Sequence, residues 1–308
     1  MRIHEHWNGI EPSDRGASVA MGNFDGVHLG HQAVIDLARK GQAPLGIVTF
    51  EPHPRQFFAP DAPPFRLMNA EARTHRLEKL GVTQLYELPF DAALAGMEAG
   101  AFVADVLVAG IGVAHVTVGA DFCFGKGRKG NVETLRNAGR RHGFGVTIAE
   151  LVAQDGEEIS STAIRAALSE GRPRDAARML GHWHRIEGAV MHGDKRGKDL
   201  GFPTANMGVE GLHLPKLGVY AVKIDILTGP HQGSYDGAAS LGVRPMFGEN
   251  QPNLETYIFD FSGGIYGEHL SVALIDYLRP EMKFDGLPDL IKQMNADCDR
   301  ARTILTTL

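Results

Sequence analysis

The sequence predicts an α/β fold followed by a β fold, namely an open, doubly wound parallel sheet and then an antiparallel β-barrel with a terminal helix. In residues 1–181, short apolar runs alternate with segments whose apolar residues recur at helical spacing, as strands and helices in turn would do. From residue 182 onward, apolar and polar residues alternate with period two between Gly- and Pro-rich turns, which favours a barrel. We therefore expect two domains, residues 1–181 and 182–308.

Composition limits the classes of function. The chain has 308 residues, of which 43% are hydrophobic and 22% charged, values ordinary for a globular protein of this length. Its net charge of −6 disfavours general nucleic-acid binding, which needs a basic field. Cys123 and Cys298 lie in no metal-ligand spacing, which favours a reducing compartment over a disulfide framework. No apolar run approaches the roughly 18 residues of a membrane span, so we expect a cytoplasmic protein without a membrane partner.

Strands and helices of the first half can be assigned in order. The apolar residues Ala17, Val19, Ala20 and Met21 indicate a buried strand, and a helix follows it. Asn69 is placed to cap a helix that runs to Leu80 and ends at Gly81. Further strands are expected at residues 45–50, 84–88, 115–118 and 145–150, and further helices around residues 102–107 and at 132–142. This alternation predicts a Rossmann-like sheet, whose ligands bind beyond the carboxyl ends of the strands.

Residues 22–31, GNFDGVHLGH, lie where the first of these strands gives way to a helix. His28 and His31 are three residues apart, which places both on one face of a first helical turn. That turn offers free backbone N–H groups and the positive end of the helix dipole to a phosphate. A single His in a turn is ordinarily solvated or capping, but two in the pattern HxGH favour a nucleotide site.

Two further segments of the first half carry polar side chains. In SSTAIR, residues 160–165, Ser160 or Ser161 can cap a helix, and Arg165 then projects toward an anion held there; a plain helix cap is the alternative. Residues 125–130 fit GxGxxG, but the first glycine follows the preceding strand by several residues, which disfavours a dinucleotide site. A mobile basic loop near phosphates and a solvated loop are the two interpretations of that segment.

The second half contains a loop that suits a metal-bound phosphate. Residues 192–206 are glycine-punctuated and cation-bearing, and they end in Thr204 and Asn206. A hydroxyl and an amide oxygen are hard donors that suit Mg²⁺ bound together with phosphates. A phosphate clamp and a disordered loop followed by an Asn turn both fit the pattern. Strands are expected at residues 185–192, 220–226, 235–243, 254–261 and 270–278, and a helix at 287–305.

Glu255 shares the period-two face of its expected strand with Tyr257, Phe259 and Phe261. A carboxylate among aromatic side chains is costly unless it is paired or functional, so Glu255 is a candidate general base. The same alternation could turn that face to solvent and make Glu255 an ordinary surface acid.

Several motifs together resemble one enzyme family. GNFDGVHLGH resembles the HxGH signature of the class I nucleotidyltransferases. Four motifs together are similar to the FMN adenylyltransferase module of bacterial bifunctional riboflavin kinase/FAD synthetases: GNFDGVHLGH, TFEPHP (residues 49–54), VGADFCFGKGRKG (118–130) and SSTAIR. The riboflavin kinase module of the same enzymes is resembled by HGDKRGKDLGFPTANM (192–207), PKLGVYAV (215–222), LGVRPMFG (241–248), LETYIFDF (254–261) and YLRPEMKFDGLPDLIKQMNAD (277–297). The motifs occur in family order over nearly the whole chain.

The resemblance implies two reactions. In the C-terminal module, the terminal ribityl hydroxyl of riboflavin attacks the γ-phosphorus of ATP, Glu255 accepts the proton, and FMN and ADP result. In the N-terminal nucleotidyltransferase module, the phosphate of FMN attacks the α-phosphorus of a second ATP, and FAD and pyrophosphate result. His28 and His31 stabilise that second transition state. ATP, riboflavin and FMN are thus the expected partners, Mg²⁺ with ATP the expected cofactor, and FMN and FAD the products.

The resemblance also implies binding roles for named residues. The metal ligands are Thr204 and Asn206 of the PTAN motif, and the residues of the flavin sites are Asp121, Phe124 and Arg279. The nucleotide-binding residues are Gly22, Asn23, Phe24, Asp25, Ser161, Thr162, Arg165, Gly193, Lys198, Gly201 and Pro203.

Three departures from the family pattern occur in the second module. Lys198 replaces an Arg, which removes bidentate phosphate binding, while Met246 and Gly264 replace a Thr and an Asp. Two rival functions are a monofunctional nucleotidyltransferase whose barrel senses a ligand or binds RNA, and a non-enzymatic flavin sensor. The residues predict no oligomeric state.

Overall fold

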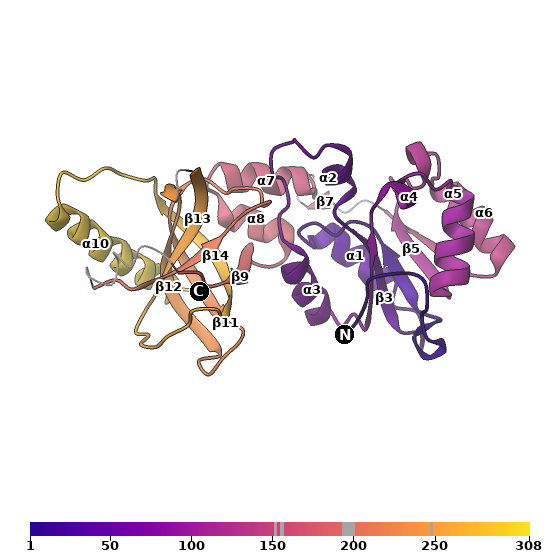
Figure 1. Cartoon of the computed structure of the whole chain (residues 1–308), viewed down its shortest axis with the longest axis horizontal. Coiled ribbons are helices and arrows are strands. Elements are labelled where there is room, and N and C mark those ends of the chain that lie inside the picture. Colours follow the sequence, from indigo (N-terminus) through magenta and orange to yellow (C-terminus); the bar gives the residue numbers. More distant parts are fainter. Residues whose placement is uncertain (151–152, 155–156, 193–200, 247–248) are drawn as a thin grey trace. The chain divides into compact units, whose positions relative to one another are not determined.

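The computed structural model describes residues 1–150, 153–154, 157–192, 201–246 and 249–308. The chain forms two compact units. The first unit contains residues 1–63 and 73–159, and the second contains residues 64–72 and 160–308. The predicted fold class is confirmed, because a parallel sheet lies in the first unit and an antiparallel barrel with a terminal helix in the second (Figure 1).

The first unit is built on a six-stranded parallel sheet in the order β1-β4-β3-β2-β5-β6. Its strands are β1 (Arg2–His4), β2 (Ser18–Met21), β3 (Leu45–Glu51), β4 (Gln84–Pro89), β5 (His115–Gly119) and β6 (Gly145–Ala149). From β2 the chain builds outward through β3 to β4, and it then crosses to β5 on the other side of β2. The topological switch point, where open sheets of this kind bind ligands, therefore lies between β2 and β5.

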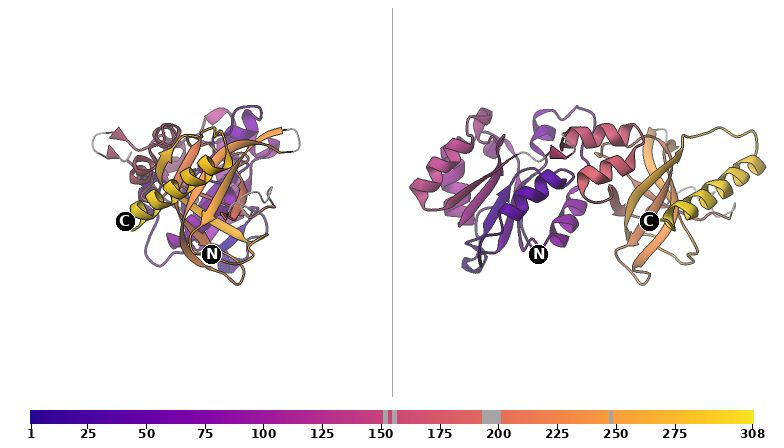
Figure 2. Two further views of the ribbon diagram at one scale, coloured as in Figure 1. Left: turned by 90° about the vertical axis from the view of Figure 1, so that its left-hand side faces the viewer. Right: turned by 180° about the vertical axis from the view of Figure 1, so that it is seen from behind.

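Helices cover both faces of this sheet, as Figures 1 and 2 show for α1 and α6. The elements are η1 (Pro12–Asp14), α1 (Leu29–Leu37), α2 (Pro54–Phe58), α3 (Ala70–Lys79), α4 (Ala92–Ala95), α5 (Ala99–Ala101), η2 (Phe102–Ile111), η3 (Lys126–Arg128) and α6 (Val132–His142), followed by the hairpin β7 (Ala153–Gln154) and β8 (Glu157–Glu158). Every residue of β2 is buried, which explains why Val19, Ala20 and Met21 are apolar; Ser18 Oγ donates to the Ala38 carbonyl at 2.6 Å.

Local sequence signals set several of these boundaries. Asn69 Oδ1 accepts a hydrogen bond from the Ala72 amide at 2.9 Å, and Gly81 adopts φ +76°, so the predicted cap and end of α3 are confirmed. The helix expected around residues 102–107 is present as η2, but it is a π-helix. Its end shows the wider spacing, because the Gly112 amide donates to the carbonyl of Leu107, five residues back.

The second unit holds a six-stranded antiparallel sheet in the order β10-β13-β12-β11-β14-β9. Its elements are α7 (Ser161–Ser169), α8 (Pro173–Leu180), β9 (Arg185–Ala189), β10 (Thr204–Gly208), β11 (Gly218–Ile226), β12 (Gly233–Met246), β13 (Glu249–Ile258), β14 (His269–Arg279) and α10 (Leu287–Leu305). Beyond β9, the Met191 amide donates to the Asn206 carbonyl at 2.8 Å and joins the two edge strands into a barrel. An apolar core that includes Met207 and Leu254 fills its interior, and α10 packs on the outside.

A short segment from the first half of the sequence belongs to this second unit. The carbonyl of Arg66 accepts a hydrogen bond from the His213 amide at 2.8 Å, and Asn69 Nδ2 donates to the Glu187 carbonyl at 2.9 Å. Glu71 contacts the His269 ring at 2.7 Å. Residues 64–72 are thereby attached to the barrel and to the helices beside it.

Two expectations about the barrel strands were wrong. Residues 204–208 form β10, whereas the sequence favoured the end of a loop or an Asn turn, because pairing with β13 imposes the extended conformation. The strand expected at residues 254–261 ends at Ile258, and Asp260 adopts φ +55°. Phe261 consequently packs against the barrel core, so it does not share the face of Glu255.

One buried histidine makes the stability of the second unit depend on pH. His184, just before β9, is 3% exposed. Burial, with smaller electrostatic contributions from the neighbouring His182 and His213, lowers the pKa of His184 from 6.5 to about 3. The folded state therefore binds this proton more weakly than the unfolded chain does.

We expect the second unit to lose stability as the pH falls below about 6.5, because protonation then favours the unfolded chain. Between pH 7.5 and 5.5 this residue should lower the free energy of unfolding by about 1.4 kcal/mol. Urea unfolding followed by Trp183 fluorescence in a Trp7→Phe background measures it. In His184→Gln, the fall in the free energy of unfolding between pH 7.5 and 5.5 should be smaller by about 1.4 kcal/mol. If both proteins show the same fall, His184 is not its cause.

Candidate functional site

The two histidines of the HxGH motif are held together at the start of α1. His28 is the N-cap, just outside the predicted first turn, and its Nδ1 accepts a hydrogen bond from the His31 amide at 3.3 Å. The two imidazole rings stack with their centroids 3.7 Å apart. A Cβ on Gly30 would lie 3.1 Å from two atoms of the His28 ring, so only glycine leaves this stack undisturbed. The motif is thus a local geometric unit.

The loop that leads to these histidines contains left-handed backbone. Phe24, Gly26 and Val27 have φ values of +51°, +86° and +43°. This conformation is unfavourable for a β-branched residue such as Val27 and is concentrated at functional sites. The loop is nevertheless fixed, because Phe24 is 1% exposed and Thr49 Oγ1 donates to the Asn23 carbonyl at 3.3 Å. Gly22 and Asp25, also predicted to bind nucleotide, lie in the same loop.

Burial controls the protonation of His31. Desolvation, with the neighbouring His28 as a second cause, lowers the pKa of His31 well below its ordinary value. Its Nδ1 is buried and, within the part of the chain that the structure describes, has no hydrogen-bond partner. Buried polar atoms are nearly always satisfied, so an unpaired nitrogen here is exceptional. A neutral imidazole there can donate one hydrogen bond and accept another.

Aromatic side chains follow the carboxyl ends of the neighbouring strands. Phe57 and Phe58 come after β3, Phe90 after β4, and Phe122 and Phe124 after β5. Their rings form continuous contacts, with centroid distances between 5.2 and 5.9 Å within each group. Because all carboxyl ends of a parallel sheet lie at one edge, this cluster lies at the same edge as the histidines. The sequence analysis missed Phe57, Phe58 and Phe90.

Phe124 and Asp121 frame the loop with the GxGxxG pattern. Phe124 is buried, while Asp121 is exposed just beyond β5. Phe124 and Gly130 exchange two backbone hydrogen bonds of 2.9 Å, which close residues 125–129 into a short turn containing η3. Three cations, Lys126, Arg128 and Lys129, stand on this turn.

The SSTAIR motif lies in the second unit, whereas the histidines lie in the first. Ser160 caps α7 and accepts from the Ala163 amide at 3.2 Å, while Ser161 and Thr162 occupy the first turn. Arg165 Nε donates to the Phe65 carbonyl at 2.6 Å, and its guanidinium lies 5.4 Å from the Phe65 ring centroid. The segment of residues 64–72 therefore orients Arg165.

The predicted metal ligands and the predicted base meet on one face of the barrel sheet. Asn206 of β10 lies directly opposite Glu255 of β13, and Thr204 lies opposite Tyr257. Residues opposite each other in an antiparallel pair point to the same side, so Thr204, Asn206 and Glu255 share a face. The other face carries the barrel core. Pairing thus brings together residues some 50 positions apart in the sequence.

Asn253 is a member of this polar face that the sequence analysis missed. Its Nδ2 donates to Asn206 Oδ1 at 3.3 Å and to Glu255 Oε1 at 3.2 Å, and the residue is 8% exposed. The period-two spacing of Asn253, Glu255 and Tyr257 in the sequence places them on one face of a strand. The sequence does not show which residues of β10 lie opposite them.

The oxygen donors of this face fit a magnesium ion. Asn206 offers an amide oxygen with two lone pairs, of which Asn253 uses one, and Thr204 offers a hydroxyl. Mg²⁺ prefers oxygen ligands and keeps part of its shell for phosphate and water. Across the described ranges, no three or more His, Cys, Asp or Glu side chains form a group that could hold a metal ion.

Arg279, predicted to contact flavin, pairs with a carboxylate on α10. Its Nη2 lies 2.7 Å from Asp297 Oδ2, and its Nε contacts both carboxylate oxygens at 2.9 and 3.0 Å. The guanidinium also lies 5.9 Å from the Phe284 ring centroid. This ion pair links β14 to the helix.

The remaining predicted nucleotide ligands lie around residues 193–203. Gly193 and Lys198 lie outside the described residues. Gly201 adopts φ +84° and Pro203 is exposed, while Phe202 between them is buried and meets Tyr257 edge-on at 5.3 Å. Of the departures from the family pattern, Met246 ends β12 and Gly264 is exposed.

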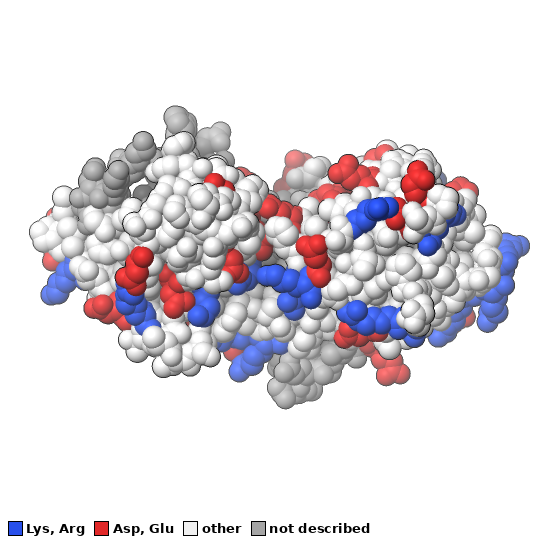
Figure 3. All heavy atoms as spheres, turned by 90° about the horizontal axis from the view of Figure 1, so that it is seen from below, with Lys and Arg blue, Asp and Glu red and all other residues white. Residues whose placement is uncertain are grey.

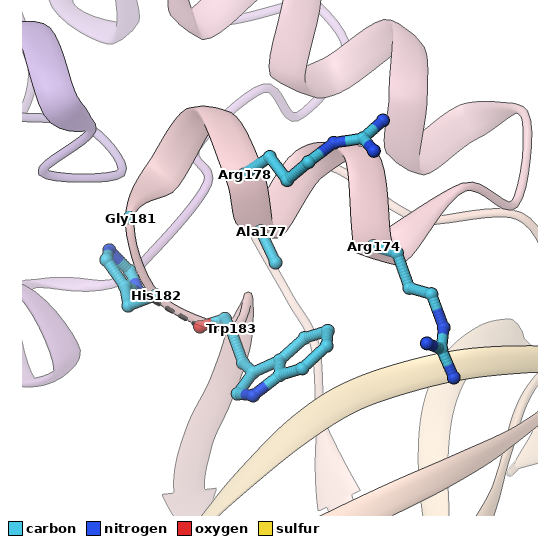
Figure 4. Close-up of a pocket in the computed structure, with 6 residues that line it drawn as sticks. All are labelled: Arg174, Ala177, Arg178, Gly181, His182 and Trp183. Carbon is cyan, nitrogen blue, oxygen red and sulfur yellow. Dashed lines mark hydrogen bonds between the residues drawn. The ribbon is translucent and has the colours of Figure 1, made fainter. Parts of the chain in front are cut away.

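A separate pocket of about 450 Å³ lies at the carboxyl end of α8 (Figure 4). None of the residues predicted from the sequence lines it. Figure 4 shows the guanidinium groups of Arg174 and Arg178 extending away from the His182 ring. Arg174 pairs with Asp276 at 3.0 Å and Arg178 with Asp175 at 2.5 Å. Because both arginines of the pocket already have carboxylate partners, the pocket is a weaker candidate site than the polar face of β10 and β13.

The surface drawn in Figure 3 carries acidic and basic side chains in mixture. On that face, the described residues form no continuous basic field of the kind that nucleic-acid-binding surfaces present. Among the helices that the structure describes, none is both long enough and apolar enough to cross a membrane.

Comparison with known proteins identifies relatives along the whole chain. A family model for FAD synthetase matches residues 10–163, and one for riboflavin kinase matches residues 180–305. The bifunctional riboflavin kinase/FMN adenylyltransferase of Pseudomonas fluorescens is 40% identical over 99% of this chain and 98% of the relative. The enzyme of the same description from Listeria monocytogenes is 38% identical, again over 99% and 98%. That of Escherichia coli K12 is 36% identical over 92% and 90%.

A solved structure has the same fold over nearly its full length. A crystal structure described as a macrolide-efflux protein from Streptococcus pneumoniae superposes with a TM-score of 0.81 at 32% identity, covering 96% of each chain. The family models and the curated relatives agree on one assignment, over both units and in the same order. The chain belongs to the family of bifunctional riboflavin kinase/FMN adenylyltransferases.

Proposed function

We propose that this protein phosphorylates riboflavin with ATP to give FMN and then adenylylates FMN with a second ATP to give FAD. Residues 182–308 are assigned the kinase reaction, and residues 1–181 the adenylyl transfer. Family membership supports both activities. The observation that carries the assignment is the polar face of β10 and β13, where Thr204, Asn206 and Glu255 converge.

In the kinase reaction, Glu255 is assigned as the general base. It accepts the proton of the ribityl hydroxyl as that oxygen bonds to the γ-phosphorus, and ADP leaves. Thr204 and Asn206 would hold Mg²⁺, which neutralises charge on the phosphates when it is bound. Phosphoryl transfer depends chiefly on positioning and charge neutralisation, and a strand pair with a fixed register supplies the positioning.

In the adenylyl transfer, the phosphate of FMN attacks the α-phosphorus of ATP and pyrophosphate leaves. FMN's phosphate is already an anion at neutral pH, so this step needs hydrogen-bond donors more than a base. His28, His31 and the backbone amides of Leu29 and Gly30 at the start of α1 are assigned as such donors. The low pKa of His31 keeps its ring neutral, which suits donation without fixed charge.

The aromatic cluster at the edge of the parallel sheet suits the isoalloxazine ring. Phe58 is 68% exposed although it contacts Phe57 and Phe90. An exposed ring that packs on two partly buried aromatic rings offers a flat, apolar surface to a planar heterocycle. Asp121 and Phe124 are retained as proposed members of this flavin site.

A monofunctional nucleotidyltransferase with a sensing barrel is the main alternative. Such a barrel would have no need of a carboxylate beside two hard oxygen donors on one face.

The cytoplasmic location of the protein is likewise a prediction.

Two complementary variants test the assignment. With riboflavin, ATP and Mg²⁺, chromatography of the flavins should show FMN first and FAD later. His28→Asn, which keeps an N-cap acceptor but removes the imidazole, should stop at FMN with adenylylation reduced about 100-fold or more. Glu255→Gln should fail to make FMN yet convert added FMN to FAD. Full FAD synthesis by His28→Asn would remove the histidine assignment, and normal FMN formation by Glu255→Gln would remove the base.

The histidine stack itself can be tested through Gly30. In Gly30→Ala, the new methyl group must displace the His28 ring, so adenylylation should fall about tenfold while phosphorylation of riboflavin stays normal. Thermal stability should not fall with it, since Ala is favoured over Gly within a helix by about 1 kcal/mol. Gly100→Ala, where the methyl group meets open space, is the matched control. Equal activity of the two variants would show that the stack is unimportant.

Phe58 should contribute to FMN binding. Removing the ring in Phe58→Ala should raise KM for FMN about fivefold or more, as the loss of one stacked aromatic surface predicts. Because the ring is mostly exposed, the free energy of unfolding should change little. Phe58→Tyr preserves the stacking surface and should keep the original KM. An unchanged KM in the alanine variant would exclude Phe58 from the flavin site.

A further inference from the structure

Asn253 occupies an unusual position on β13, between two glycines. Gly208 of β10 and Gly242 of β12 pair with it in register. A Cβ at Gly208 would clash with the carboxylate of Glu210, and one at Gly242 would clash with that of Glu281. Because both register partners are glycines, neither neighbouring strand presents a side chain of this row opposite Asn253. Its amide has no cross-strand partner in its own row and extends along the sheet to the next one.

That next row holds the two acceptors of the proposed kinase site. The distances from Asn253 Nδ2 are 3.3 Å to Asn206 Oδ1 and 3.2 Å to Glu255 Oε1. An amide nitrogen carries two hydrogens, so a single group can serve both oxygens. With Asn253 8% exposed, these hydrogen bonds lie in a largely water-excluded place, where they are stronger than at the surface.

The physical need for such a donor is clear. Asn206 Oδ1 and Glu255 Oε1 are both acceptors, and two partial or full negative charges that face each other repel unless a donor or cation lies between them. The Nδ2 group of Asn253 is that donor. It also settles which end of the Asn206 amide faces Asn253, because the reversed Asn206 amide would place the NH₂ groups of the two asparagines together.

We propose that Asn253 is a positioning residue for the phosphoryl transfer. It orients the amide oxygen of Asn206 toward the metal-bound phosphates and aligns the Glu255 carboxylate beside it, while touching neither substrate. The inference rests on the proposed kinase function of this face. Outer partners of metal ligands commonly contribute about 10- to 100-fold to activity or metal affinity, which sets the scale of the expected effect.

The first test is a split between kcat and KM. Asn253→Leu has a similar volume and no donor, and it should lower kcat for riboflavin phosphorylation about 10- to 100-fold with KM for riboflavin changed less than about twofold. Asn295→Leu, which removes an exposed Asn of α10, is the matched control and should keep the original kcat. Adenylylation of added FMN, assigned to residues 1–181, should be normal in both variants.

The second test needs no turnover. Calorimetry of ADP binding, with and without Mg²⁺, measures how much the metal strengthens binding. In Asn253→Leu this gain should shrink about tenfold while ADP alone binds as before. A merely structural role would weaken both forms of binding or neither, so it would not produce this pattern.

The outcomes separate the two hypotheses. If the wild-type chain makes no FMN, the proposed kinase function fails, whatever Asn253 does to metal-dependent binding. If the wild-type chain makes FMN and Asn253→Leu keeps both its kcat and its Mg²⁺-dependent gain, the positioning role is overturned. Should the Leu variant not fold, Asn253→Asp keeps the shape and replaces the donor by a third acceptor. Asn253→Asp should also lose kcat, and a wild-type kcat there would equally refute the inference.

Discussion

The register between β10 and β13 is the constraint on which the proposed kinase site depends. Side chains of a strand alternate between its two faces, so a slip of one residue would exchange Glu255 for Leu254 or Thr256. Leu254 and Met207 belong to a core that is excluded from water, and moving a carboxylate into that core would cost several kcal/mol. The hydrophobic core therefore fixes the register, and the register assembles the polar face. Stability and the arrangement of the site have a common cause here.

The first unit achieves the same result by topology. The strand order of the parallel sheet reverses beside β2, so the connections on its two sides lead away from each other and leave a crevice at the carboxyl ends of the strands. The HxGH loop lies at that end of β2. The loop has three left-handed residues, which the burial of Phe24 and the hydrogen bond from Thr49 hold in place. Backbone strain is tolerated at this point because packing around the loop over-determines its shape.

Sequence reasoning reached the parts of this structure that depend on short-range pattern. The buried run of β2, the cap of α3 at Asn69 and the position of the HxGH motif are all set by neighbouring residues. It failed where partners are remote. β10 is a strand because β13 lies beside it, and its own sequence, TANMG, contains little that favours a strand.

The same limit explains the functional residues that were missed. The role inferred for Asn253 needs the register of three strands, and no single strand reveals the two glycines beside it. Phe57 and Phe58 are ordinary aromatic residues of a five-residue helix until the sheet places them beside Phe90. The attachment of residues 64–72 to the second unit likewise reflects contacts across more than a hundred positions, such as Asn69 with Glu187.

The two proposed sites differ in the way that their reactions require. A ribityl hydroxyl must lose a proton to become a nucleophile, so a phosphoryl transfer to it benefits from a carboxylate such as Glu255. The phosphate of FMN is already charged, and a second carboxylate beside it would repel it. The histidine site accordingly offers imidazoles and backbone amides, and burial keeps His31 uncharged. A neutral donor stabilises charge as it develops on the phosphorane without binding the anionic product too tightly for release, which is the balance that a step yielding both FAD and pyrophosphate demands.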